Sequence, residues 1–379
     1  MIRIREPFHG AVLNHRHGRK VKGGLEIPVW GTAPVGEPVT VNGVGARRLG
    51  ERFDAAVVLR ASETEIVAAS DGVAGRGEHR IRVVWDRHSK PRYRFGIDDN
   101  IFFARDIAAK RYKSLFQSPY LGGLRKLNRK YGTKFVLNLF YATPENDFNL
   151  SQFPVSYKGE WADNAHWLKL AFHAYAEFPD RPYQNCAPAK LAKDFDLVAE
   201  EILRFAGRAA YSPTTIPHWG MVHPTAWKVL AERGVRVLSG YFLPNTGSSY
   251  ATQGESIGGE PSAASFGYDV NYGLDSVRSE HLSRHDAMKD FASGMVFSKI
   301  DLVCNNVPPE QVASVLEPLA RDPNTAEIMD LSTHEQYFWP FYFNYRPDHF
   351  KRLDAAIRFC TERGYEPVFL HEGFLGVKE

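Results

Sequence analysis

Cysteine is scarce in this chain of 379 residues, and the three that occur follow no pattern. Cys186, Cys304 and Cys360 lie far apart and form no CxxC or CxxH spacing. An odd number of unpatterned cysteines argues against a disulfide framework and against a thiolate zinc site. The fold must rest on a hydrophobic core, for which the 44% of apolar residues provide ample material.

Long apolar runs and runs of like charge are also missing. The start, "MIRIREPFHG", lacks the apolar segment of a signal peptide, and no stretch reaches the roughly 18 apolar residues of a membrane helix. The 47 basic and 44 acidic residues are interspersed, which gives nucleic-acid binding no electrostatic support. We therefore expect no nucleic-acid partner, no membrane, and a cytoplasmic protein, or a secreted one if a signal was removed. A homodimer is compatible with the sequence.

Short β-rich runs fill the first ninety or so residues. Examples are "LEIPVWG", "FDAAVVL" and "HRIRVVWD", which are separated by Gly, Pro, Asn and Asp. Regularly spaced short strands with turn residues between them are typical of an all-β sandwich. We therefore predict a small sandwich domain over residues 1–92.

From Arg94 onward, strand-like runs alternate with helical ones. The helices are expected near residues 104–130, 161–168, 190–207, 224–233, 309–321 and 347–363. Such alternation predicts a parallel sheet or barrel with helices outside. Seven or eight strands over residues 93–379 suit a closed or nearly closed barrel. The Gly/Ser-rich stretch 244–290 is aperiodic, and we interpret it as an active-site lid or a surface loop.

Titratable and amide residues stand where several apolar runs end. In a parallel α/β barrel, reactive side chains project from the C-terminal ends of strands. The residues at these positions are Asp98, Asp99, Asn138, His173, His218, His334 and Glu335. Carboxylates and imidazoles of this kind are the ligands of a divalent-metal hydrolase site with an open position for water.

The adjacent acids in "GIDDN" allow two interpretations. Asp or Asn before a helix can cap its free N–H groups, but a cap needs one acid. Two ionised carboxylates at a buried strand end repel each other unless a cation or a proton neutralises one. A metal ligand beside a general base accounts for both Asp98 and Asp99.

The other clusters are ambiguous when taken one at a time. His173 and Glu177 are four residues apart, so on a helical turn both could reach one metal, or His173 could be a core residue and Glu177 a solvated one. His218, in "PHWG", is either structural or catalytic. His334, in "STHEQYF", could donate a proton as general acid, with Glu335 to orient it.

In this order, the clusters resemble the motifs of the polysaccharide deacetylases, carbohydrate esterase family four. The segments that match are "GIDDN", "FHAYAEFPD", "TTIPHWG" and "LSTHE". The resemblance spans residues 93 to 371 and implies an irregular (β/α)₇ barrel. The β-rich start resembles the immunoglobulin-like modules of carbohydrate-active enzymes.

The resemblance also implies roles for individual residues. Asp98 would be the general base and His334 the general acid, while Asp99 and His173 would bind a divalent metal, with zinc as the first expectation. Two departures concern the remaining ligands. Glu177 stands where the family has a second histidine, and His218 replaces the third motif's arginine as a further ligand or a substrate contact. Residues expected to bind substrate are Trp219, Glu335 and Tyr337.

The sequence therefore predicts a metal-dependent hydrolase that removes an N- or O-acyl group from a carbohydrate. Two alternatives stay open. Paired carboxylates on the same barrel could cleave glycosidic bonds, which requires two carboxyl groups about 5 to 9 Å apart. A protein that kept the barrel but lost its chemistry would bind glycans without turnover.

Overall fold

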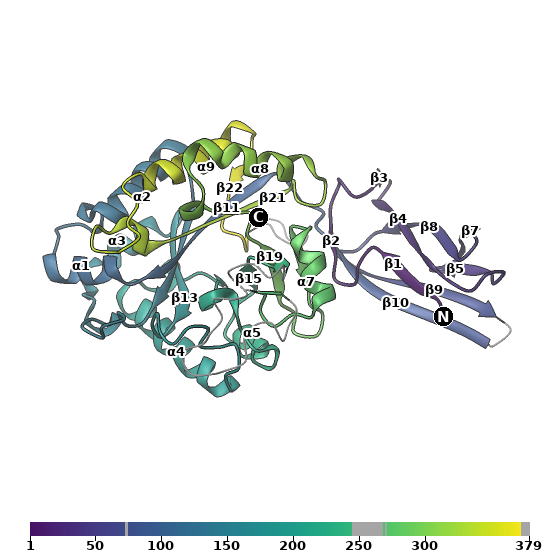
Figure 1. Cartoon of the computed structure of the whole chain (residues 1–379), viewed down its shortest axis with the longest axis horizontal. Helices are drawn as coiled ribbons and strands as arrows, with labels where there is room; N and C mark the ends of the chain where they lie inside the picture. The colour runs from purple at the N-terminus through teal and green to yellow at the C-terminus, as the bar shows by residue number, and fades with distance from the viewer. Residues whose placement is uncertain (73–74, 245–267, 270, 373–379) are drawn as a thin grey trace. The chain divides into compact units, whose positions relative to one another are not determined.

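The computed structural model describes residues 1–72, 75–244, 268–269 and 271–372, and they form two compact units (Figure 1). The first unit contains Met1–Ser89 together with Ala287–Val296, and the second contains Lys90–Asp286 and Phe297–His371. The segment Ala287–Val296 is fastened within the first unit by a bridge between Ala11 and Met288 and by an ion pair of 2.6 Å between Lys289 and Glu63.

Two five-stranded sheets make up the first unit. One has the order β1-β4-β8-β7 with β3 beside β4, and the other has the order β2-β10-β9-β5-β6. The strands are β1 (Arg3–Glu6), β2 (Val12–Leu13), β3 (Arg19–Val21), β4 (Gly24–Thr32), β5 (Val39–Val41), β6 (Val44–Gly45), β7 (Arg47–Leu49), β8 (Arg52–Leu59), β9 (Glu63–Gly72) and β10 (Gly75–Trp85), and β18 (Ala287–Lys289) lies in the added segment.

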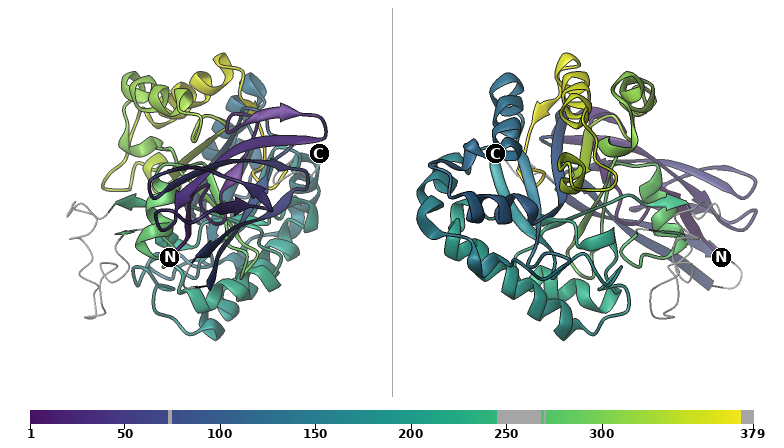
Figure 2. Two further views of the ribbon diagram at one scale, coloured as in Figure 1. Left: turned by 90° about the vertical axis from the view of Figure 1, so that its right-hand side faces the viewer. Right: turned by 60° about the vertical axis from the view of Figure 1, so that its left-hand side comes forward.

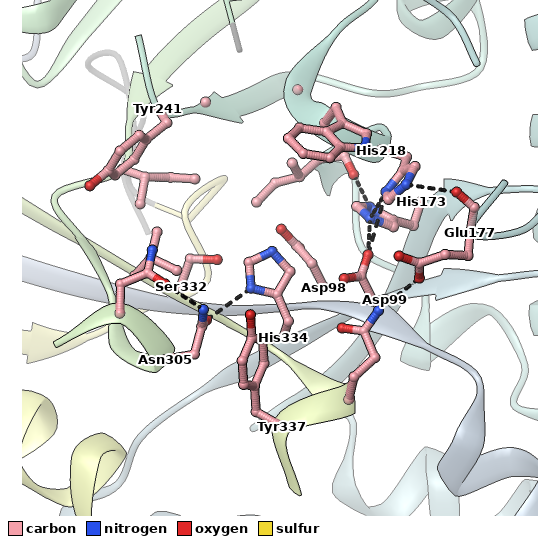
Figure 3. Close-up of a pocket in the computed structure, with 18 of the residues that line it drawn as sticks. Asp98, Asp99, His173, Glu177, His218, Tyr241, Asn305, Ser332, His334 and Tyr337 are labelled. Atoms are coloured by element: carbon pink, nitrogen blue, oxygen red, sulfur yellow. Dashed lines mark hydrogen bonds and ion pairs between the residues drawn. The ribbon is translucent and has the colours of Figure 1, made fainter. Parts of the chain in front are cut away.

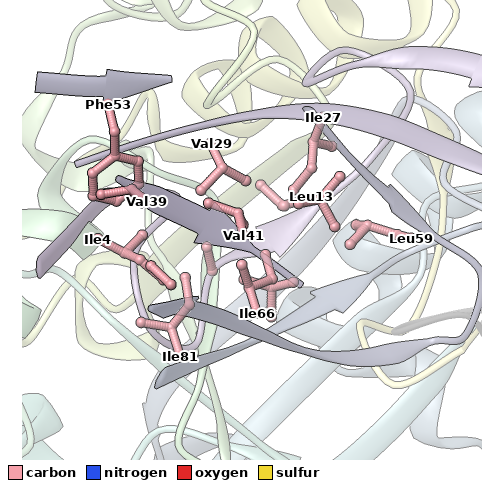
Figure 4. Packing of buried hydrophobic residues seen from close by; sticks show 14 of the residues in the cluster. Ile4, Leu13, Ile27, Val29, Val39, Val41, Phe53, Leu59, Ile66 and Ile81 are labelled. Atoms are coloured by element: carbon pink, nitrogen blue, oxygen red, sulfur yellow. The ribbon is translucent and has the colours of Figure 1, made fainter. Parts of the chain in front are cut away.

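Alternating apolar residues from both sheets form one hydrophobic cluster (Figure 4). In β4, Leu25, Ile27 and Val29 are at most 1% exposed, while Pro28 between them is exposed. This period of two is what a strand with one face in a core requires. Ile66 of β9 in the other sheet joins the same cluster. The expected β-rich unit is therefore present, and its immunoglobulin-like character stays a prediction.

The second unit mixes helices with parallel strands (Figure 1). Its strands are β11 (Arg92–Asn100), β12 (Phe135–Phe140), β13 (Leu168–Ala174), β14 (Thr214–Thr215), β15 (Val237–Gly240), β16 (Leu243–Pro244), β17 (Tyr268–Asp269), β19 (Val296–Lys299), β20 (Leu302–Val303), β21 (Ile328–His334) and β22 (Glu366–Pro367). Its helices are α1 (Phe102–Lys110), α2 (Pro119–Tyr131), α3 (Lys158–Asn164), α4 (Pro188–Phe205), α5 (Trp227–Glu232), α7 (Ser276–Ser283), α8 (Val312–Arg321) and α9 (His349–Glu362).

Strand β11 is central to the main sheet of this unit. The sheet order is β13-β12-β11-β21-β20, all parallel, with β22 beside the start of β11. All nine residues of β11 are buried, as in parallel strands that are covered on both faces. Helices surround these strands in Figure 2. The predicted α/β class is confirmed, but the described strands lie in separate sheets, including β14-β15-β19, so a closed barrel stays a prediction.

Most predicted helices lie within a few residues of their expected positions, and two expectations need correction. The helix expected over residues 104–130 is two helices, α1 and α2, because the chain turns at a 3₁₀ segment and α2 starts anew at Pro119. Of the expected loop 244–290, residues 245–267 and 270 lie outside the described residues, and the rest contains the unpredicted helix α7. Among the described residues, no helix combines the length and the apolarity that a membrane crossing demands.

A buried ion pair joins β11 to β21. Arg94 and Asp330 are register partners, their Nε and Oδ1 atoms are 2.6 Å apart, and both side chains are at most 2% exposed. The hydroxyl groups of Ser239 and Ser298 also donate to Asp330. Gly96 leaves room for the Arg94 guanidinium, because a Cβ atom at position 96 would clash with it.

We expect Asp330→Ala to lower the free energy of unfolding by about 3–5 kcal/mol, because it leaves the guanidinium buried without its carboxylate. The double variant Arg94→Met with Asp330→Leu should lose much less, since no charge stays buried. Urea unfolding of both variants measures the difference. Equal losses in the single and the double variant would contradict this assignment.

Candidate active site

A cavity of about 410 Å³ opens in the second unit, where strands β11, β13, β15 and β21 end (Figure 3). The carboxyl ends of parallel strands are the usual place for a ligand in an α/β sheet. Its lining includes Asp98, Asp99, His173, Glu177, His218, Trp219, Tyr241, Asn305, His334, Gln336, Tyr337 and Tyr342. The site therefore collects residues that lie up to 245 positions apart in the chain, from position 98 to position 343.

A bulge in β11 explains how two consecutive acids face one cavity. Successive side chains of a regular strand point to opposite faces, so Asp98 and Asp99 should point apart. Between Ile97 and Asn100, however, β11 advances three residues while β12 advances two, and Asp99 has a left-handed φ of 60°. The extra residue breaks the alternation, and both carboxylates line the cavity.

Asp99, His173 and His218 form a buried cluster with three potential ligand atoms within 4.8 Å of one another (Figure 3). Asp99 Oδ1 is 2.9 Å from His173 Nε2 and 3.4 Å from His218 Nδ1, and the two ring nitrogens are 3.1 Å apart. The three side chains come from β11, β13 and the turn after β14. Phe140 packs against both imidazoles, with ring centroids 5.0 Å away in each case.

The far side of each imidazole faces a backbone carbonyl. His173 Nδ1 is hydrogen-bonded to the carbonyl oxygen of Ile216, and His218 Nε2 lies 3.1 Å from that of Glu177. A carbonyl oxygen only accepts, so in the neutral rings these nitrogens carry the hydrogens. His173 Nε2, His218 Nδ1 and Asp99 Oδ1 then present three lone pairs to one another. Such an arrangement requires a positive charge between them.

The charges around this cluster favour an ionised Asp99. Burial raises the pKa of a carboxyl group, but the charge of His334 and the adjacent imidazoles of His173 and His218 hold the pKa of Asp99 well below its usual range. Burial acts to lower the pKa of His218, and Asp99 outweighs it, so this pKa is raised. The cluster is therefore a site for positive charge on electrostatic grounds as well.

Asp98 and His334 form a second pair next to this cluster. They are register partners on β11 and β21. Asp98 Oδ1 accepts a hydrogen bond of 2.6 Å from the amide of Asn138. His334 Nδ1 lies 2.9 Å from Asn305 Oδ1, which leaves its Nε2 for the cavity (Figure 3). A carboxylate and an imidazole that line one cavity can serve as proton acceptor and proton donor.

Glu177 lines the cavity but lies outside the three-residue cluster. Its Oε2 accepts a hydrogen bond of 2.7 Å from Gln336. Burial, followed by the charge of Asp99, raises the pKa of Glu177 to about 8. The helical turn expected to align it with His173 is wrong, because β13 extends to Ala174 and an irregular segment follows.

Glu335 is turned away from the cavity. It is fully buried, and its carboxylate accepts hydrogen bonds from the backbone N–H groups of Ile101, Phe102 and Phe103 at 2.7, 2.9 and 2.5 Å. It also accepts one of 3.0 Å from the Trp339 indole. Glu335 therefore caps the first turn of α1, in the place where a helix favours negative charge, and does not contact a bound substrate.

The two aromatic residues expected at the site do line it. Trp219 has a left-handed φ of 65°, and the guanidinium of Arg181 lies 4.7 Å from its ring centroid. The Tyr337 ring centroid is 6.2 Å from that of His334. Both therefore offer flat apolar surface beside the titratable groups.

Asn138, which bonds to Asp98, was among the candidates from the sequence, but the amides that hold His334 and Glu177 were missed. Asn305 follows the apolar run "IDLVC", so the criterion of polar residues at strand ends could have found it. Gln336 follows His334 and Glu335, but no spacing indicates that it reaches Glu177, 159 positions earlier in the chain.

Comparisons with known proteins add little to this geometry. No protein-family model matches the chain, and no curated protein matches it. Among solved structures, it is similar to a carbohydrate esterase family four (CE4) esterase from Streptococcus mutans, with 10% identity over 74% of this chain and 85% of that one and a TM-score of 0.36.

Two further structures are similar at the same level. A polysaccharide deacetylase from Mycobacterium smegmatis, described as putative, has 13% identity over 73% of this chain and 84% of that one, with a TM-score of 0.41. A 4-alpha-glucanotransferase from Thermococcus litoralis has 11% identity over 72% and 38%, with a TM-score of 0.43. These low scores do not establish a shared fold, so the function is argued from the site alone.

We expect Glu335→Gln to lower the stability of the protein by about 1–3 kcal/mol, because an amide presents one acceptor where the carboxylate presents two to buried N–H donors. The metal affinity of the folded variant should stay within a small factor of wild type, since Glu335 does not face the cavity. Urea unfolding and zinc titration measure the two effects. Unchanged stability together with lost metal affinity would place Glu335 in the site after all.

Proposed function

We propose that this protein is a metal-dependent hydrolase that removes an acyl group from a carbohydrate. The observation that carries the proposal is the convergence of three lone pairs, on Asp99 Oδ1, His173 Nε2 and His218 Nδ1, within 4.8 Å of one another. No hydrogen atom of the two neutral rings points into this space. A divalent cation is the species that satisfies all three atoms at once.

The donor set fits zinc. Two imidazole nitrogens and one carboxylate oxygen are a common ligand set of catalytic zinc, with a further position open to water or substrate. The hydrogen bonds from the outer ring nitrogens to the carbonyl oxygens of Ile216 and Glu177 orient such ligands and set their tautomers. When bound, the cation supplies a Lewis acid and lowers the pKa of water.

The protein's own residues then handle the protons. A water molecule adds to the acyl carbon, and Asp98, oriented by Asn138, accepts its proton. His334, protonated and held through Nδ1 by Asn305, gives the proton at Nε2 to the leaving nitrogen or oxygen. The C–N or C–O bond breaks, and the products are a carboxylic acid and an amine or an alcohol.

The cavity walls support a carbohydrate as the group that carries the acyl chain. Trp219 and Tyr337 can stack on the apolar faces of sugar rings, and the amides of Asn305 and Asn306 can bond to hydroxyl groups. These groups line the same cavity as Asp98 and His334.

A second candidate is glycosidic cleavage, which Glu177 favours. With a pKa of about 8 it is protonated at neutral pH, as a general acid must be, and Asp98 could act as the partner carboxylate. Glu335 is excluded from this role because its carboxylate caps α1. Release of reducing ends without release of a carboxylic acid would favour this candidate.

We expect purified wild-type protein to bind one equivalent of zinc, and Asp99→Ala with His218→Ala to bind none. Glu177→Ala is the matched control, because it removes a cavity carboxylate outside the three-residue cluster and should keep the metal. Elemental analysis after dialysis gives the stoichiometry. A wild-type protein that takes up no divalent metal would remove the basis of the proposal.

We expect Asp98→Asn to lower kcat on acetylated glycans by about 10²–10⁴-fold, because the amide cannot accept a proton. His334→Gln should act similarly, while both variants keep their zinc. Acetate release measures kcat, and elemental analysis serves as the control. Metal binding without turnover by wild type on any acylated glycan would instead favour a non-catalytic binding protein.

A further inference from the structure

We propose that Asn100 is a positioning residue of the metal centre: its amide holds the bulge that turns the Asp99 carboxylate toward His173 and His218. This inference rests on the proposed function, since it concerns the affinity of that site for a cation. Asn100 itself lies outside the cavity lining and outside the ligand cluster. Its effect on the metal is therefore indirect.

The Asn100 side chain is fully buried and bonded at both ends. Its amide nitrogen lies 2.6 Å from the carbonyl oxygen of Ile97, 3.2 Å from that of Asp98 and 3.1 Å from that of Asn138. Its Oδ1 accepts a hydrogen bond of 2.6 Å from the Tyr120 hydroxyl. One donor group thus serves both β11 and β12 at the point where their register breaks.

These contacts matter because the backbone at Asp99 is intrinsically unfavourable. A residue other than glycine seldom adopts a left-handed φ, although Asp tolerates it better than most, and it does so where surrounding contacts determine the conformation. The carbonyl groups of the two peptides that flank Asp98, those of Ile97 and Asp98, are bonded to Asn100. If the amide is lost, these oxygens lose a buried donor, and a regular strand becomes the competing state.

A regular strand would disrupt the ligand set. Restored alternation points the Asp99 side chain to the face opposite Asp98, away from both imidazoles. His173 and His218 would keep their positions, because their outer nitrogens bond to the carbonyl groups of Ile216 and Glu177. The site would then keep two ligands and lose its only anionic one.

Zinc titration of metal-stripped protein tests the inference. We expect Asn100→Ala to bind zinc about 10–100-fold more weakly than wild type, the usual effect of removing an outer partner of a metal ligand. Tyr120→Phe removes only the hydroxyl that bonds to Asn100 and should weaken binding by a smaller factor, about threefold or more.

The matched control is Tyr93→Phe. Tyr93 is also fully buried, lies on β11 itself, and has one hydroxyl hydrogen bond of 2.9 Å, to Thr133. Loss of the Tyr93 hydroxyl should lower the melting temperature of the metal-free protein as much as loss of the Tyr120 hydroxyl does. Zinc affinity should be unchanged, because this hydroxyl lies at the opposite end of the strand from Asp99.

The outcomes separate this inference from the proposed function. If wild type binds no zinc, the proposed function fails and this inference with it. If wild type binds zinc and folded Asn100→Ala binds equally well, only this inference is overturned. Should Asn100→Ala not fold, equal zinc affinities of Tyr120→Phe and Tyr93→Phe overturn it, and weaker binding by Tyr120→Phe alone supports it.

Discussion

The site depends on one backbone irregularity, the bulge at Asp99. A strand that is buried on both faces directs every second side chain to one face of the sheet, so it can offer a cavity only alternate residues. The left-handed residue in β11 lets two neighbouring carboxylates share the cavity. In the proposed mechanism, one accepts a proton while the other joins two imidazoles around a cation. Without the bulge, one strand could supply two acids to the cavity only from alternate positions, not from adjacent ones.

Uncharged amides orient the titratable groups around the proposed cation site. Asn138 bonds to Asp98, Asn305 to His334, and Gln336 to Glu177. A carboxamide fixes the direction of its hydrogen-bond partner and leaves the partner's charge unchanged. An arginine or a carboxylate in the same place would neutralise a partner of opposite charge. The charges of the cavity are therefore not neutralised by these amide partners. This differs from the ion pair of Arg94 with Asp330 in the same sheet, where each charge is neutralised by the other.

Residues at strand ends were predictable, and their directions were not. Asp98, Asp99, His173 and His334 end apolar runs, and because parallel strands end at one edge of a sheet, their convergence follows from the pattern. Glu335 follows His334 in sequence, yet the 3₁₀ turn at Glu335–Phe338 directs it to the first turn of α1.

Sequence spacing also favoured Glu177 equally with His218 as a ligand, because the spacing of His173 and Glu177 was interpreted as a helical turn. The structure distinguishes the two candidates, because His173 lies on the extended strand β13 and not on a helical turn shared with Glu177. The bulge itself has no sequence signal beyond Asn after two acids.

Protein contacts hold the three potential ligand atoms in place. His173 lies on a buried strand, His218 follows another, and Phe140 packs against both rings. Each ring is also tied to a backbone carbonyl on its outer side. These contacts of the folded core therefore offset the unfavourable free energy of bringing three electron-rich atoms together. In zinc fingers, by contrast, the metal organises the chain. The proposed function needs an ion that binds to the folded protein and keeps an open position for water or substrate, and a preformed ligand set suits such an ion.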